Sequence, residues 1–121
     1  MLLGLLLLAV FLVWRRPGPP LSVMGVSTTV SPGRVGCGGT AVVVGTIRTN
    51  GSAGSVRYRW RRSDGVSQEP EELRLSRGAR SVEVVLRWTL RGHGRLNASA
   101  VLHVLSPASF DATSRFTYTC R

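Results

Sequence analysis

Val56-Arg57-Tyr58-Arg59-Trp60-Arg61 is the most regular stretch of this 121-residue sequence. Apolar and basic side chains alternate along it with a period of two, which is the period of a β-strand with one buried face. The alternation predicts that Val56, Tyr58 and Trp60 point into a core, with Trp60 at its centre, and that the arginines between them point to solvent. Ser63-Asp64-Gly65 then ends the strand with a tight turn.

Further short runs of alternating apolar residues lie on both sides of this stretch and are separated by turn signals such as Asn50-Gly51. The expected strands span residues 22–30, 40–49, 56–61, 73–75, 82–90, 97–106 and 115–120. The inward positions include Trp88, Phe116, Tyr118 and Cys120, whereas His103 points outward. About seven short strands at this spacing predict an all-β sandwich.

An unbroken apolar run opens the chain at residues 2–14. Its length suits a signal peptide and falls short of the ~20 residues that span a bilayer. No basic residue precedes the run, and Arg15 and Arg16 follow it, where the positive-inside rule would hold them in the cytoplasm. We therefore expect a short apolar helix that forms the outer part of a signal-anchor, in a chain that begins inside a longer protein. A cleaved signal peptide is the alternative.

The expected division of the chain has three parts. Residues 1–16 form the signal-anchor or signal-peptide segment, residues 17–21 form a proline-rich linker, and residues 22–121 form one β-sandwich domain. The two cysteines, Cys37 and Cys120, bracket this domain. In a small exported domain they predict one disulfide, and two unrelated buried thiols are the alternative.

Seven parts of the domain together match a known pattern: Cys37, Gly45-Thr46-Ile47-Arg48-Thr49-Asn50-Gly51, Val56-Arg57-Tyr58-Arg59-Trp60, Arg62-Ser63-Asp64-Gly65, Trp88-Thr89-Leu90, Val104-Leu105-Ser106-Pro107 and Phe116-Thr117-Tyr118-Thr119-Cys120. With these residues the domain resembles the short immunoglobulin-like domains found on the outside of GC-rich actinobacteria, where they follow a transmembrane segment or a signal sequence. The resemblance covers residues 22–121, and it implies an immunoglobulin-like sandwich outside the cytoplasm. The chain departs from antibody domains, because its cysteines precede the second strand and end the last one.

No group of residues in the sequence predicts catalysis, a metal site or a cofactor. His93 lies in a glycine turn and His103 on an outward strand position, so both are expected to be solvated. The acidic residues Glu69, Glu71 and Glu72 fit a polar loop and do not have the spacing of a calcium-binding EF-hand. A phosphate-binding glycine loop and a nucleophile elbow are both missing from the sequence. We therefore expect a protein that is not an enzyme.

The basic residues predict a candidate binding surface. All sixteen are arginines, and the formal net charge is +10. If the third strand pairs with the sixth and the sixth with the last, one outer face holds Arg57, Arg59, Arg61, His103 and Arg115. We expect no acidic residue at the outward positions of these strands. Such a face would attract anionic cell-wall polymer or lipid headgroups, and the alternative is a solvated face in which codon usage supplies the arginines.

Taken together, the sequence predicts a non-catalytic extracytoplasmic module that is tethered to the membrane through residues 2–14. Its role would be binding, display, or service as a sensor or spacer domain of the cell envelope, and another envelope protein is a second candidate partner. The alternative is a freely secreted domain that binds anionic cell-wall polymer through the arginine-rich face. Nucleic acid is not an expected partner, because the aromatic residues between the arginines point inward.

Overall fold

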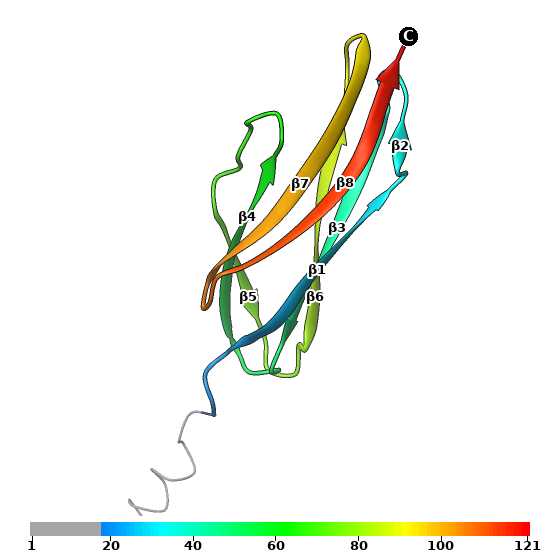
Figure 1. The fold of residues 1–121 in the computed structure, drawn as a ribbon. Helices are drawn as coiled ribbons and strands as arrows, with labels where there is room; N and C mark the ends of the chain where they lie inside the picture. Colours follow the sequence, from blue (N-terminus) through cyan, green and yellow to red (C-terminus); the bar gives the residue numbers. More distant parts are fainter. Residues whose placement is uncertain (1–17) are drawn as a thin grey trace, which may run out of the picture.

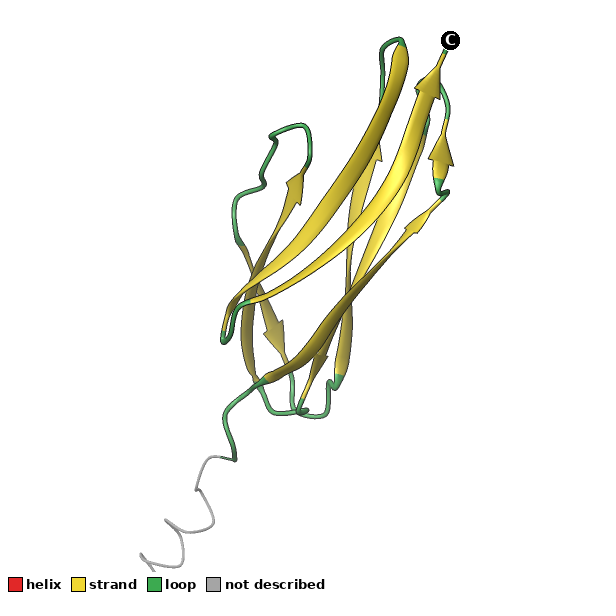
Figure 2. Cartoon of the chain, viewed as in Figure 1, coloured by secondary structure: helices red, strands yellow, loops and turns green. Residues whose placement is uncertain are grey.

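The computed structural model describes residues 18–121, which form eight β-strands and no helix (Figure 1 and Figure 2). The short apolar helix expected near the N-terminus lies outside the described residues. The strands are β1 (Val23–Ser31), β2 (Arg34–Val35), β3 (Thr40–Thr49), β4 (Gly54–Arg62), β5 (Glu71–Leu75), β6 (Ser81–Thr89), β7 (Gly94–Ser106) and β8 (Phe110–Cys120).

The strands form two sheets. A three-stranded sheet has the order β1-β3-β6, and a five-stranded sheet has the order β2-β8-β7-β4-β5. All neighbours are antiparallel except β2 and β8, which are parallel. Figure 1 shows β7 and β8 side by side along the length of the molecule. The predicted pairing of the third strand with the sixth, and of the sixth with the last, is confirmed in β4, β7 and β8.

The main core lies between the two sheets and is built around Trp60 of β4, which is 2% exposed. Leu102 of β7 lies directly opposite Trp60 in the five-stranded sheet and is also buried. Gly45 of β3 faces both side chains from the other sheet. A Cβ at Gly45 would overlap Leu102 Cδ2 and lie 3.2 Å from Trp60 Cη2, so the glycine leaves the space that these two large side chains fill.

A second group of buried residues closes one end of the sandwich. Trp88 of β6 packs edge-to-face on Phe116 of β8, with ring centroids 5.3 Å apart. The Tyr118 hydroxyl donates a hydrogen bond to the carbonyl oxygen of Gly92 at 2.6 Å. The predicted disulfide is present at the same end, where Cys120 at the end of β8 is joined to Cys37 in the β2–β3 loop.

The structure differs from the sequence expectation in the bounds of its strands and in the burial of two side chains. The last strand begins at Phe110 instead of residue 115, and β2 adds a short strand that pairs with it. Tyr58, expected in the core, is half-buried because its hydroxyl reaches the edge of the sheet and donates to Glu71 Oε2 at 3.0 Å. Leu21, expected in the linker, is 8% exposed and belongs to the main core.

Candidate binding surface on the five-stranded sheet

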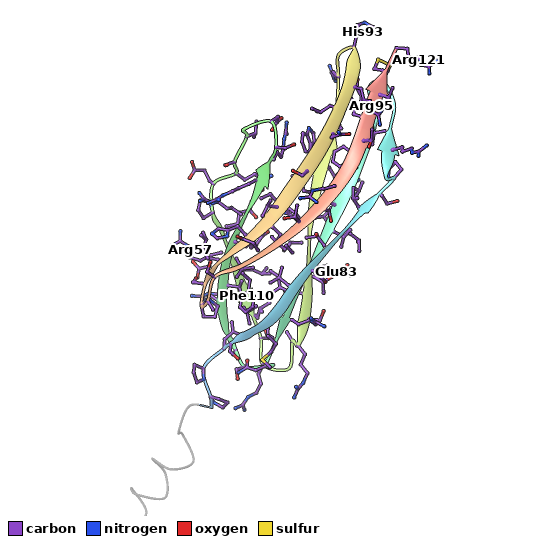
Figure 3. The ribbon with its side chains drawn as sticks, viewed as in Figure 1. Arg57, Glu83, His93, Arg95, Phe110 and Arg121 are labelled. Carbon is purple, nitrogen blue, oxygen red and sulfur yellow. A yellow bond between two sulfur atoms is a disulfide. The ribbon has the colours of Figure 1, made fainter. Side chains whose placement is uncertain are left out.

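Every strand of the five-stranded sheet carries at least one arginine on its outer side. The register places these residues on the same side of the sheet, opposite to the side that contributes to the core. We call them the arginine surface, which consists of Arg34, Arg57, Arg59, Arg61, Arg74, Arg95 and Arg115. Figure 3 shows Arg95 toward one end of the molecule and Arg57 well below it, so the surface runs along most of the sheet.

The structure places all five predicted site residues on this outer side. Arg57 and Arg61 of β4 and Arg115 of β8 are exposed. Arg59 lies between them on β4 and pairs with His103 of β7. It is half-buried, and its Nε has no hydrogen-bond partner within the protein. A buried donor without a partner costs free energy, so the Arg59 side chain is held at some cost to stability.

The expectation that no acidic residue lies among the outward positions of these strands is wrong. Asp111 is an outward residue of β8, because β8 begins earlier than expected, and it pairs with His103 in the register. His103 Nδ1 contacts Asp111 Oδ1 directly. Glu72 on β5 lies opposite Arg57. The negative charge of Asp111 and of Glu72 therefore lowers the net positive charge of this outer side.

Sequence reasoning missed Arg34, Arg74 and Arg95 as members of the arginine surface. Arg34 lies on the short strand β2, and Arg95 belongs to the first part of β7, which the hydrophobic pattern does not include. Arg74 alternates with Leu73 and Leu75 and could have been found from that pattern. Arg34 and Arg95 line a hollow of about 530 Å³ together with Arg121, Thr117 and Thr119. Figure 3 shows Arg95 and Arg121 near the same end of the molecule.

A separate hollow of about 490 Å³ lies at this end of the sandwich and is lined by Trp88, Tyr118 and His93 among others. The Arg62 guanidinium lies over the Trp88 ring, 4.4 Å from its centroid, and forms an ion pair with Asp64. Hydrogen bonding to Arg62 lowers the pKa of Asp64, so this carboxylate stays charged near neutral pH. Arg91 and Arg95 also line this hollow, but Asp64 offsets part of their charge, whereas the hollow formed by Arg34, Arg95 and Arg121 has no acidic residue in its lining.

Among residues 18–121, no three His, Cys, Asp or Glu side chains are grouped so that they could hold a metal ion. No helix within the same residues is long and apolar enough to cross a bilayer.

Comparison with known proteins shows the fold. No protein-family model matches the sequence, and no curated protein is similar to it in sequence. The CARDB domain of the PF1109 protein from Pyrococcus furiosus, in a crystal structure described as a complex with di-metal ions, is similar in structure. Its TM-score is 0.58 at 17% identity, over 85% of this chain and 96% of that one. The solution structure of the same domain gives a TM-score of 0.57 at 17% identity, over 86% of this chain and 98% of that one.

Larger proteins contain a similar domain. The alkylpurine DNA glycosylase AlkC from Pseudomonas fluorescens matches with a TM-score of 0.53 and 13% identity, over 84% of this chain and 31% of the glycosylase. A β-glucosidase from Listeria innocua matches with a TM-score of 0.51 and 13% identity, over 83% of this chain and 16% of the enzyme. Because the identities are low, these likenesses concern architecture alone. The described chain is an immunoglobulin-like β-sandwich with the fold of CARDB domains.

Proposed function

We propose that the protein is a non-catalytic extracytoplasmic module of the cell envelope, tethered to the membrane through residues 2–14, that binds anionic cell-wall polymer through the arginine surface. The distribution of charge between the two sheets carries the proposal. The outer side of the five-stranded sheet has seven arginines and two acidic residues. The outer side of the three-stranded sheet has Arg48, Arg87 and Glu83 among serine, threonine and valine residues.

The spacing of the arginines suits a polymer with repeated anionic groups. Outward residues of one strand are about 7 Å apart, and neighbouring strands are about 4.8 Å apart. Arg57, Arg59 and Arg61 therefore form a row of guanidinium groups along β4, and Arg115 and Arg95 extend the positive surface across β8 and β7. A guanidinium binds phosphate or carboxylate oxygens through paired hydrogen bonds, so several weak contacts would add along one polymer chain.

The disulfide supports the extracytoplasmic location. Disulfides form and persist in oxidising compartments and are rare in the cytosol of most organisms. The bond between Cys37 and Cys120 is therefore compatible with an exported domain behind the apolar segment at residues 2–14. The resemblance to exported actinobacterial domains supports the same location and suggests a cell wall as the source of the polymer.

Cosedimentation with purified cell walls tests the binding proposal. The full chain, kept in a mild non-ionic detergent, is expected to sediment with walls at low salt. It should remain in solution at about 1 M salt, where charges are screened beyond about 3 Å. The combined variant Arg57→Ser, Arg59→Ser and Arg61→Ser should lower the bound fraction several-fold at low salt.

A matched variant distinguishes binding through the arginine surface from binding that depends only on the net charge of the protein. Arg48, Arg77 and Arg80 are exposed and lie outside the arginine surface. The combined variant Arg48→Ser, Arg77→Ser and Arg80→Ser loses the same charge and should bind walls like the unchanged protein. Equal losses in the two variants would mean that overall charge is responsible, and unchanged binding in the first variant would exclude this surface.

The alternative to a tethered module is a freely secreted domain with the same binding surface. Fractionation of cells that express the full native reading frame distinguishes the two. A tethered module should be recovered with the membranes. Recovery of the domain only from the medium would show that the apolar segment is removed, while leaving the binding proposal in place.

A further inference from the structure

Strand β6 forms a long free edge. It has nine residues, and within residues 18–121 it pairs only with β3. Their register runs from one end to the other without a bulge. The other outer strands are less available, because β5 has five residues, β2 has two, and β1 is held near β8 by a hydrogen bond from Ser114 Oγ to Thr28 Oγ1. Long regular edges are usually protected by a bulge, a proline, charged side chains or a covering element. Strand β6 has no bulge or proline, and its two charged residues, Glu83 and Arg87, have opposite signs.

The backbone groups of β6 alternate between its partner and the free edge. Leu90 N–H donates to Gly39 C=O, and Thr49 N–H donates to Arg80 C=O. In an antiparallel pair every second residue bonds to the same neighbour, so the even-numbered residues from 80 to 90 bond to β3. Glu83, Val85 and Arg87 consequently direct their N–H and C=O groups toward the free edge, where a further strand could bind.

The side chains of the same three residues are also available. Glu83, Val85 and Arg87 all point to the outer side of the three-stranded sheet and are exposed, with Val85 at 49%. Figure 3 shows Glu83 on the opposite side of the molecule from Arg57. The exposed valine and the two opposite charges on a free edge offer both apolar surface and charge to a neighbouring strand.

We propose that two copies of the protein pair through β6, antiparallel, about a two-fold axis at Val85. In this register Val85 lies opposite Val85 of the second copy, and Glu83 lies opposite Arg87 of the second copy on both sides of the axis. All three pairs occupy hydrogen-bonding positions of the antiparallel ladder. Centring the axis on Glu83 or Arg87 would instead place like charges opposite each other, which is unfavourable. The charge pattern of β6 therefore matches itself in one register.

The overall charge of the molecule is compatible with this contact. Two copies with a large positive charge repel each other, so they meet most easily through their least positive surface. Pairing through β6 joins the two three-stranded sheets into one sheet of six strands and leaves the arginine surfaces on separate parts of the dimer. Pairing through β5 would bring these surfaces edge to edge. If the proposed function also holds, a dimer would present two binding surfaces to one polymer.

Charge reversal tests the pairing. Molar mass is measured by sedimentation over a range of concentrations, with the full chain in mild non-ionic detergent. The unchanged protein should approach twice the monomer mass as concentration rises. Glu83→Arg and Arg87→Glu, each alone, place like charges opposite each other at both symmetric positions, and each should weaken dimerisation by about tenfold or more. The double variant should dimerise like the unchanged protein.

Mixing gives the sharpest result. One single variant has two arginines at positions 83 and 87, and the other has two glutamates. Equal amounts should form a mixed dimer, because every pair across the axis is then of opposite charge.

Val85→Pro should abolish pairing and keep the fold, since the Val85 N–H is not bonded to β3. A monomer at all concentrations would overturn the proposal, as would a dimer that none of these variants affects, which would associate through another part of the chain. Neither result bears on cell-wall binding.

Discussion

At the scale of single residues, Tyr58 shows how the edge of the core changes the chemistry of a side chain. Partial burial raises the pKa of Tyr58, and the hydrogen bond to Glu71 and its negative charge raise it further, to about 12. The ordinary value is 10.0. The folded state therefore favours the neutral phenol. This contribution to stability is complete below pH 10 and is lost as the pH rises from about 10 to about 12.

Ultraviolet titration of tyrosinate and urea unfolding at alkaline pH measure this effect. We expect one tyrosine to ionise near pH 12 and the free energy of unfolding to fall between pH 10 and 12. Tyr58→Phe should remove the late ionisation and flatten that part of the stability profile. Glu71→Gln should lower the pKa of Tyr58 only in part, because burial is the larger cause. A protein in which no tyrosine ionises later than an exposed one would contradict the assignment.

Trp60 and Gly45 show what a residue pattern can and cannot predict. The alternation around Trp60 predicts its burial, and it is 2% exposed. The same parity places Gly45 inward, but the reason for a glycine there is a pair of large side chains on other strands, Trp60 and Leu102. That contact depends on how the two sheets pack against each other, and the alternation of residues along one strand does not predict this packing. The Trp60 Nε1 is buried with no hydrogen-bond partner, a cost that no sequence pattern reveals.

At the scale of elements, the strands that are rich in large apolar residues are predictable, and the ends of strands are not. The predicted run at 40–49 matches β3, and the run at 82–90 differs from β6 by one residue at each end. The beginning of β8 is not predicted from the sequence because its inward Phe110 is followed by Ala112 and Ser114, which give little apolar alternation. They are held by pairing with β7, and Ser114 also bonds to Thr28 on β1.

That missed strand end altered the predicted binding surface. The sequence pattern leaves Asp111 before the last strand, so it does not predict the acidic residue on this surface or the contact between His103 and Asp111. The arginines of β4 depend only on alternation and were placed on the outer side from the sequence alone. Those of β2 and β7, Arg34 and Arg95, join them through strand pairing over long sequence distances, which requires the whole topology.

At the scale of the whole molecule, the separation of charge follows from the division of strands between the sheets. Strands β4 and β6 both alternate apolar residues with polar ones, but β4 supplies three outward arginines and β6 one arginine and one glutamate. Since these strands lie in different sheets, the molecule has one strongly positive side and one nearly neutral side. The two proposed contacts use these two sides separately, so a polymer and a second copy would not compete for the same surface.

The disulfide is the only covalent link between distant parts of the described chain, and it joins residues 83 positions apart. By limiting the freedom of the unfolded chain, a bond that closes a loop of this length stabilises the folded state by about 4–5 kcal/mol. We expect the double variant Cys37→Ser and Cys120→Ser to lose about this free energy of unfolding in urea. Its far-ultraviolet circular dichroism should be unchanged, because β8 still pairs with β7 along its whole length, from Phe110 to Cys120. Reduction of the unchanged protein should have the same effect, whereas two free thiols in the unreduced protein, or equal stability with and without reductant, would show that the bond does not form.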